Sequence, residues 1–188
     1  FALYADDCQE GMIFFEGEWS AALTNLCVPY EFSLSQQSTV QAFYRFYTVT
    51  INNSPIANTD WIAAYKDGIC VGAYLWDPDY CLNGVCLVPA MGNDGSDWTE
   101  GYMQTGEFPD FEIYDTSENE YYDAEPSEDE AWGYLEILLI SSLEVNVPLQ
   151  ACTDSNACNY DPNASEDDGN CEYEPNCELS INDRIKQA

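Results

Sequence analysis

The sequence contains no histidine and only four basic residues, and these shortages exclude several classes of function. Without histidine, neither a Ser-His-Asp nor a Cys-His catalytic arrangement can form, and a His-ligated zinc site is excluded as well. Four lysines and arginines cannot build the basic patch that nucleic acid phosphates require, and they disfavour binding to anionic membrane surfaces. A carboxylate pair could still hydrolyse a glycosidic bond, but among 35 acidic residues such pairs arise by chance. We therefore expect a protein that is not an enzyme and does not bind nucleic acid.

Long apolar runs are also missing. The best one, Leu135–Leu143, suits a β-strand and falls short of the roughly 18 apolar residues that a membrane-spanning helix needs. No signal peptide is recognisable, and the first residue is Phe1 rather than Met, which indicates a processed or truncated chain. We expect a secreted chain, extracellular or at the cell surface, without membrane insertion.

The sequence is rich in acids, cysteine and aromatic residues. Its 35 acidic residues against four basic ones give a net charge of −31, while 46% hydrophobic and 14% aromatic residues argue against disorder. So many acidic side chains repel one another, so salt or divalent cations should stabilise the folded state. Nine cysteines without histidine indicate disulfides in an oxidising compartment rather than zinc.

The positions of the cysteines suggest specific pairs. Cys8 with Cys27 and Cys81 with Cys86 are plausible disulfides, and Cys70 would then be an odd thiol buried on its strand, unless it takes one of the latter two partners. The remaining four lie near the C-terminal end and allow three connectivities, between which the sequence does not choose: Cys152, Cys158, Cys171 and Cys177.

The stretch from Gln41 to Trp76 predicts three successive strands. Aromatic and β-branched residues fall on both parities of Ala42–Ile51, as in a central or interface strand. Lys66-Asp67-Gly68 between two further apolar segments is a hairpin signal. Later strands are expected at 108–115, 120–124 and 132–145. Short alternating strands without a helical period predict an all-β fold, an antiparallel β-sandwich of immunoglobulin-like or jelly-roll type.

The domain organisation follows from shifts in composition. Residues 31–145 form the predicted β-sandwich, and residues 1–30 precede it, either as its leading part or as an extension that pairs with a neighbouring copy. A Pro-containing linker, 146–151, leads into a segment poor in large apolar residues and dense in Asp, Asn and Cys. We predict a small disulfide-tied, calcium-binding-like repeat at 152–177 and a tail at 178–188.

Cys152–Tyr173 resembles a known type of repeat. ACNYDPNA, the closing DDGNC and the spacing C-x5-C-x12-C are similar to the short Cys/Asp-rich repeat of secreted, surface-attached proteins of Bacteroidetes-type bacteria, which is akin to thrombospondin type 3 calcium repeats. WIAAYKDGICVGAYLWD, VPAMGNDG and GYMQTGEFPDFEIYD are similar to a β-rich module that accompanies such repeats. This resemblance implies location and architecture more than activity.

Calcium is the cofactor that this composition favours, because it takes six to eight hard oxygen ligands. A segment so poor in apolar residues would need disulfides and metal to hold it together, although an acidic solvated tail remains the alternative. The candidate ligands in the repeat are Asp154, Asn156, Asn159, Asp161, Asn163, Asp167, Asp168 and Asn170. A second candidate is the glycine-containing loop 91–100, with Asn93, Asp94 and Asp97.

Two functions are compatible with these features. The first is a non-catalytic extracellular structural subunit that assembles head to tail with copies of itself into a filament or adhesive surface layer, with Phe1–Phe15 as the strand that one copy lends to the next. The second is a carbohydrate-binding module that stacks sugars on exposed aromatic side chains. The candidates for such stacking are Trp76, Trp98 and Trp132.

Overall fold

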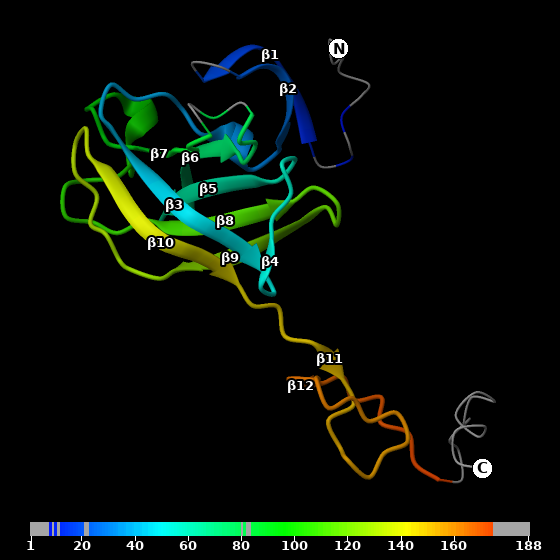
Figure 1. Ribbon diagram of the computed structural model, residues 1–188. Helices are drawn as coiled ribbons and strands as arrows, with labels where there is room; N and C mark the ends of the chain where they lie inside the picture. The colour runs from blue at the N-terminus through cyan, green and yellow to red at the C-terminus, as the bar shows by residue number, and fades with distance from the viewer. Residues whose placement is uncertain are drawn as a thin grey trace. The chain divides into compact units, whose positions relative to one another are not determined.

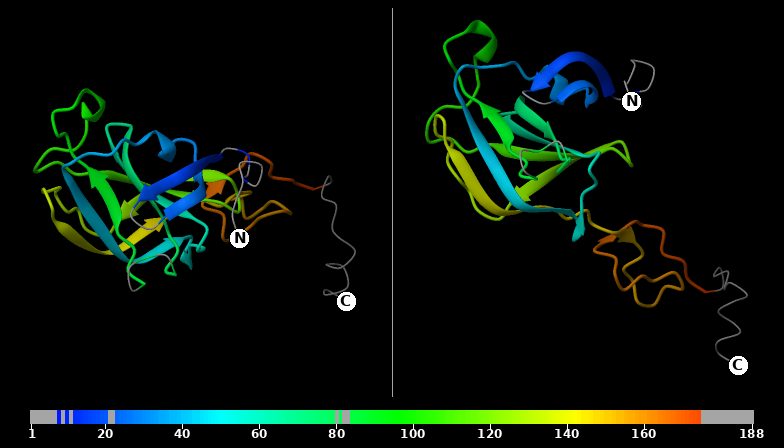
Figure 2. Two further views of the ribbon diagram at one scale, coloured as in Figure 1. Left: turned by 90° about the horizontal axis from the view of Figure 1, so that it is seen from above. Right: turned by 45° about the horizontal axis from the view of Figure 1, so that its top comes forward.

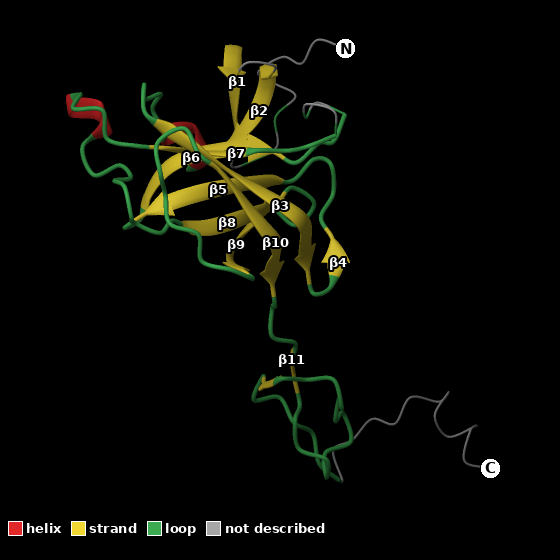
Figure 3. Cartoon of the chain, turned by 60° about the vertical axis from the view of Figure 1, so that its left-hand side comes forward, coloured by secondary structure: helices red, strands yellow, loops and turns green. Residues whose placement is uncertain are grey.

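The computed structural model describes residues 8, 10, 12–20, 23–79, 81 and 84–174, and nearly all of the regular structure within them is β. The helical turns in this part of the chain are two short 3₁₀ segments, η2 (Phe32–Leu34) and η3 (Asp97–Thr99). No helix there is long and apolar enough to cross a membrane. The predicted all-β class is confirmed, and Figure 3 shows it directly.

The chain divides into two compact units, Phe1–Asn146 and Val147–Ala188, and each is described by itself. The first contains a curled sheet in the order β4-β3-β10-β9-β8-β5-β6, with β7 paired to β3 (Figure 1). Its strands are β3 (Gln41–Ile51), β4 (Ser54–Pro55), β5 (Trp61–Lys66), β6 (Ile69–Leu75), β7 (Val88–Met91), β8 (Asp110–Asp115), β9 (Glu120–Pro126) and β10 (Ile137–Val145).

One pairing corrects the sequence-based prediction of an antiparallel fold. β10 runs parallel to β3, with Ile137 opposite Phe43 and Val145 opposite Ile51, whereas the other described pairings of this sheet are antiparallel. Alternation of apolar and polar residues reports which face of a strand is buried and not the direction of its neighbour. Because a long connection separates β3 from β10, the two strands are free to run the same way. The sheet is therefore mixed.

The predicted hairpin between β5 and β6 is present. Asp67 and Gly68 both have positive φ, 49° and 79°, as a tight turn between twisted strands requires. On the next strand, Gly72 lies so close to the Pro89 carbonyl that any side chain there would clash with it. This close approach lets β6 pack against β7 within the curled sheet that Figure 2 shows.

The concave side of the curled sheet holds the main core. Strands β3 and β5 to β10 all contribute buried side chains to it. Among the largest are Tyr44, Ile62, Ile113, Ile140 and Leu143.

A second, smaller core covers the opposite face of β5, β6 and β8. Trp61, Tyr65 and Tyr114 point to this side, and Phe32 of η2 lies on them, fully buried. Val28, near the end of β2, belongs to the same cluster. The sheet is thus covered on both faces here, and the covering layer is the segment that connects the N-terminal hairpin to β3.

The N-terminal hairpin consists of β1 (Met12–Ser20) and β2 (Leu23–Pro29), which pair antiparallel with bulges beyond Phe15. Of the predicted donor strand Phe1–Phe15, residues 1–7, 9 and 11 lie outside the described residues. The rest of that segment from Met12 onwards pairs with β2 of its own chain.

The second unit has little regular structure. β11 (Gln150–Ala151) pairs parallel with β12 (Glu166–Asp167), and the other described residues form turns. Only Cys152 and Ala157 are buried among the described residues of this unit. It therefore has no hydrophobic core of its own in the part that the structure describes, as the composition predicts.

Candidate functional site

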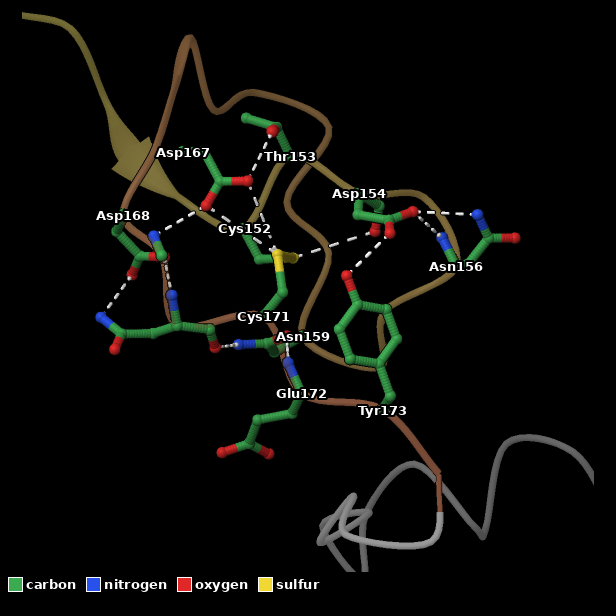
Figure 4. Close-up of a disulfide and its surroundings, with 12 residues drawn as sticks. Cys152, Thr153, Asp154, Asn156, Asn159, Asp167, Asp168, Cys171, Glu172 and Tyr173 are labelled. Carbon is green, nitrogen blue, oxygen red and sulfur yellow. Dashed lines mark hydrogen bonds between the residues drawn. A yellow bond between two sulfur atoms is a disulfide. The ribbon is translucent and has the colours of Figure 1, made fainter.

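The C-terminal unit is built around the disulfide between Cys152 and Cys171 (Figure 4). Around it, aspartates close short turns by accepting the backbone N–H two residues further on: Asp154 from Asn156, Asp161 from Asn163, Asp167 from Gly169 and Asp168 from Asn170, at 2.7–2.9 Å. Such turns are the usual local use of Asp. They replace the missing core as the source of local order.

Several other side-chain oxygens of this unit also have protein partners. Asp154 Oδ2 accepts the Tyr173 hydroxyl at 2.7 Å, and Asp167 Oδ2 accepts Thr153 Oγ1 at 3.1 Å (Figure 4). Asn159 bridges two backbone segments, because its amide donates to the Asn170 carbonyl and accepts the N–H of Glu172. The hydrogen bonds that Asp154 accepts lower the pKa of its carboxyl. The backbone N–H of Asn156 is the largest cause, followed by the Tyr173 hydroxyl.

The loop that follows β7 is held by a single carboxylate. Asp94 Oδ2 accepts the backbone N–H and the hydroxyl of Thr39, and Oδ1 accepts the Ser96 N–H and the Thr99 hydroxyl. These donors lower the pKa of Asp94, with the Thr39 N–H as the largest cause. Asn93 closes its own turn onto Gly95. Asp94 thus ties the loop to the segment before β3 and has both oxygens engaged.

Neither predicted calcium region brings its acids together. In the described part of the chain, no three Asp, Glu or Cys side chains converge on a point that could hold a metal ion. The donor chemistry of the repeat suits calcium, since its ligands are hard oxygens. In the loop 91–100 both oxygens of Asp94 accept protein donors, and calcium binding there stays a prediction.

The expected disulfides Cys8–Cys27 and Cys81–Cys86 are both present. Cys70 is free and buried, as expected, and burial is the main cause that raises the pKa of its thiol to about 12. Cys158 is disulfide-bonded, and Cys177 lies outside the described residues. Disulfides in both units indicate an oxidising environment.

The outward face of β3 and β10 carries large apolar side chains, several of which are more than half exposed. On β3 the inward residues alternate with Phe43, Arg45 and Tyr47, and parallel pairing places Ile137 and Leu139 of β10 beside the first two. Tyr47, Ile137 and Leu139 are 51–57% exposed. These five residues are called the β3–β10 outer face below. The guanidinium of Arg45 lies 4.6 Å from the centre of the Tyr47 ring.

Leu135 is a further exposed apolar residue, just before β10 begins at Ile137. It is 64% exposed and has a φ of 60°, in the left-handed region that branched side chains rarely adopt. Its N–H donates to the Gln41 carbonyl, which fixes it beside the first residue of β3. Strained backbone that presents an apolar side chain to solvent is a feature often retained for function.

Of the three tryptophans predicted to stack on sugars, two belong to the main core. Trp132 is buried and donates its indole N–H to the Ala90 carbonyl, and Trp76 packs against the same cluster. Trp76 follows β6 directly and Trp132 lies between the charged stretch after β9 and β10, and neither local pattern reveals that the ring turns inward. Trp98, in η3, is 63% exposed.

No family model, curated protein or solved structure matches this chain. The resemblance of its repeat and module to secreted bacterial proteins therefore remains a prediction.

Proposed function

We propose that this chain is a non-catalytic extracellular structural subunit that assembles with copies of itself into a filament or surface layer. The observation that supports this most is the β3–β10 outer face, an apolar sheet surface on a chain whose net charge is −31. Large apolar patches on soluble proteins commonly mark interaction sites. The exposed apolar side chains of such a sheet face become buried when another sheet packs on it, as in β-sandwiches.

A second copy is the occupant that the charges favour. Arg45 is one of four basic residues in the chain, and it stands in the middle of the apolar surface. A neighbouring copy, with 35 acidic residues, offers carboxylates to pair with it at the rim of the contact. The same excess of acid repels approaching copies, so assembly should require salt or divalent cations to screen the charge.

The magnitudes indicate that this face does not act alone. Tyr47, Ile137, Leu139 and Leu135 are each about half exposed, so covering them adds roughly half of the ~1.5–3 kcal/mol for full burial, about 3–6 kcal/mol together. Association costs about 4–15 kcal/mol in lost freedom of motion. A further contact is needed, and strand pairing by the N-terminal segment would supply it. Repeated along a fibre, two such contacts per subunit give an open assembly.

The remaining parts of the proposal concern location and metal. The disulfides support an extracellular setting, and the C-terminal unit, with its Asp-rich turns, is the part that we propose to bind calcium. We also propose that the curled sheet and its covering layer are a variant of an immunoglobulin-like or jelly-roll sandwich.

Sedimentation velocity tests the proposal. The unmodified chain should sediment increasingly fast as its concentration rises in salt and calcium, whereas Leu139→Lys should remain a monomer, because it places a charge within the apolar contact. The control is Thr48→Lys, an exposed position further along β3 that lies outside the apolar surface. Assembly that survives Leu139→Lys, or that Thr48→Lys abolishes equally, contradicts the assignment of this face.

A second candidate, carbohydrate binding, is favoured by Trp98. Its ring is exposed on a loop that Asp94 holds in place, which is how a flat stacking surface for a sugar is kept rigid. Binding of soluble polysaccharides that Trp98→Ala removes, in a chain that stays monomeric, would favour this function over assembly.

A further inference from the structure

A pocket of about 520 Å³ lies on the face of β5, β8 and β9 that carries the smaller core. Ala63 and Tyr65 of β5 point to this face, and pairing places Glu112 beside Ala63 and Asp110 beside Tyr65. Glu112 in turn stands opposite Asp123 of β9. Beyond the aromatic cluster under Phe32, this face of the sheet is therefore acidic.

The charged side chains that line the pocket all carry the same sign. Glu31, which precedes η2, reaches it from the covering layer, and the sheet and the segment after β9 supply the others: Asp110, Glu112, Asp123, Glu125 and Asp129. Lys66, next to Tyr65 in the sequence, is not among the lining residues and pairs with Asp67 and Glu107 instead. No basic residue lines the pocket in the part of the chain that the structure describes.

Two buried polar atoms at this site make no hydrogen bond of good geometry: the Tyr65 hydroxyl oxygen and Glu112 Oε2, although the hydroxyl lies close enough to Glu112 to lower the pKa of its carboxyl. Tyr65 is only 8% exposed, and both residues line the pocket. A buried polar group without a partner costs free energy, and native proteins rarely retain one without a reason. The Tyr65 hydroxyl has one proton, which it can direct towards Glu112, and lone pairs on both oxygens then remain open to a further donor from the pocket.

The acidic side chains of the pocket repel one another. Like charges directly opposite each other on paired strands destabilise a sheet, and Glu112 and Asp123 are such a pair. Burial is the main cause that raises the pKa of Glu112. The neighbouring Tyr65 hydroxyl lowers this pKa in part, and the charges of Asp123 and Glu31 raise it further. Perturbed, mutually repelling groups in a pocket are characteristic of a binding site.

We propose that this pocket binds an organic cation, a primary ammonium or guanidinium group, through the Tyr65 hydroxyl and the surrounding carboxylates. Such a group donates several hydrogen bonds and accepts none, which complements the unpartnered oxygens. It also offsets the repulsion between the acids. A chelated metal ion suits the pocket less well, because no three of the described acids converge and the volume exceeds that of a single ion.

The cation can come from a small amine or from a Lys or Arg side chain of a partner protein. The chemistry of the bound group is the same, and the source decides only how much additional surface is buried. The inference does not depend on self-assembly, because it rests on a different face of the molecule.

Calorimetric titration of the full chain with n-butylammonium tests the proposal, with n-butanol as the neutral probe of the same shape. Butylammonium should bind and butanol should not. Tyr65→Phe removes only the unpartnered hydroxyl and should weaken binding roughly tenfold or more, since a hydrogen bond to a charged group is lost. Asp123→Asn should weaken it as well. Glu120→Gln is the control, an acid on the same strand that does not line the pocket.

Several outcomes would overturn the inference. Equal heats for butylammonium and butanol would do so, and so would a loss of binding that Glu120→Gln causes as strongly as Asp123→Asn, since the attraction would then be a diffuse effect of net charge. Calcium binding that depends on Tyr65 and Asp123 would replace the amine with a metal. A peptide with one central lysine distinguishes the two sources: tighter binding than butylammonium indicates a protein partner, and equal or weaker binding indicates a small amine.

Discussion

Phe32 is the residue whose removal should most affect the layer over the smaller core. Its ring is fully buried and meets Tyr65, Tyr114 and Tyr121 edge-on, with ring centres 6.3, 6.4 and 5.3 Å apart. Truncating a buried Phe to Ala costs about 3–5 kcal/mol, and each aromatic pair adds about 0.5–1.5 kcal/mol beyond area burial. We expect Phe32→Ala to lower the free energy of unfolding by about 4–5 kcal/mol, a large share of a typical total.

Cys70 provides a local readout of the same change. Its Sγ lies 3.9 Å from the Phe32 carbonyl oxygen, and its buried thiol, with a pKa raised to about 12, should react with iodoacetamide only when the layer opens. Denaturation followed by tryptophan fluorescence gives the stability, and mass spectrometry of the Cys70 peptide gives the labelling rate. Phe32→Ala should speed labelling by about a thousandfold if opening follows stability.

Leu34→Ala is the matched control, because Leu34 lies in the same 3₁₀ turn and is exposed. It should change stability by no more than about 0.5 kcal/mol. If Phe32→Ala costs less than about 1 kcal/mol and leaves the labelling of Cys70 as slow as before, the segment before β3 is not the layer that covers this face.

Three further predictions concern single groups. Because burial raises the folded-state pKa of Glu112, its charge destabilises the fold above that pKa; Glu112→Gln should raise the melting temperature at pH 7, and the gain should vanish as the pH falls below the ordinary value of 4.5. An equal gain at both pH values would contradict this. Replacing Cys152 and Cys171 by Ala opens a disulfide of sequence separation 19, worth about 3 kcal/mol, so proteolysis should quicken after Val147 while the first unit resists as before. Calcium at a hundredfold excess over its Kd should stabilise the C-terminal unit by about 2.7 kcal/mol, and a melting profile that a chelator leaves unchanged in low salt would argue against calcium binding.

Features set by neighbouring residues were predictable from the sequence. The Lys66-Asp67-Gly68 turn follows from residues that tolerate positive φ, and Cys81 with Cys86 from a short separation. The buried Cys70 follows from its place in an apolar strand. The anchor Phe32 was not predictable, because nothing in the sequence distinguishes it from the nearby Tyr30 and Leu34, which are exposed, and it acquires its role only from the cluster it covers.

The candidate sites depend on pairings that the sequence does not reveal. Ile137 and Leu139 resemble Leu138 and Ile140 in an apolar run, and only the position of β10 beside β3 decides which pair faces solvent. The acidic pocket likewise arises from register, which places Glu112 opposite Asp123. In the repeat the spacing of Asp and Asn predicts oxygen ligands, and the structure adds that one oxygen of Asp154 and one of Asp161 close turns, which the spacing did not reveal.

Cryo-electron microscopy of the full chain, at high concentration in salt and calcium, tests self-assembly most directly. The account predicts fibres or layers in which Ile137 and Leu139 are buried against a neighbouring copy. Single particles under every condition, or an assembly that leaves this face in contact with solvent, would contradict it.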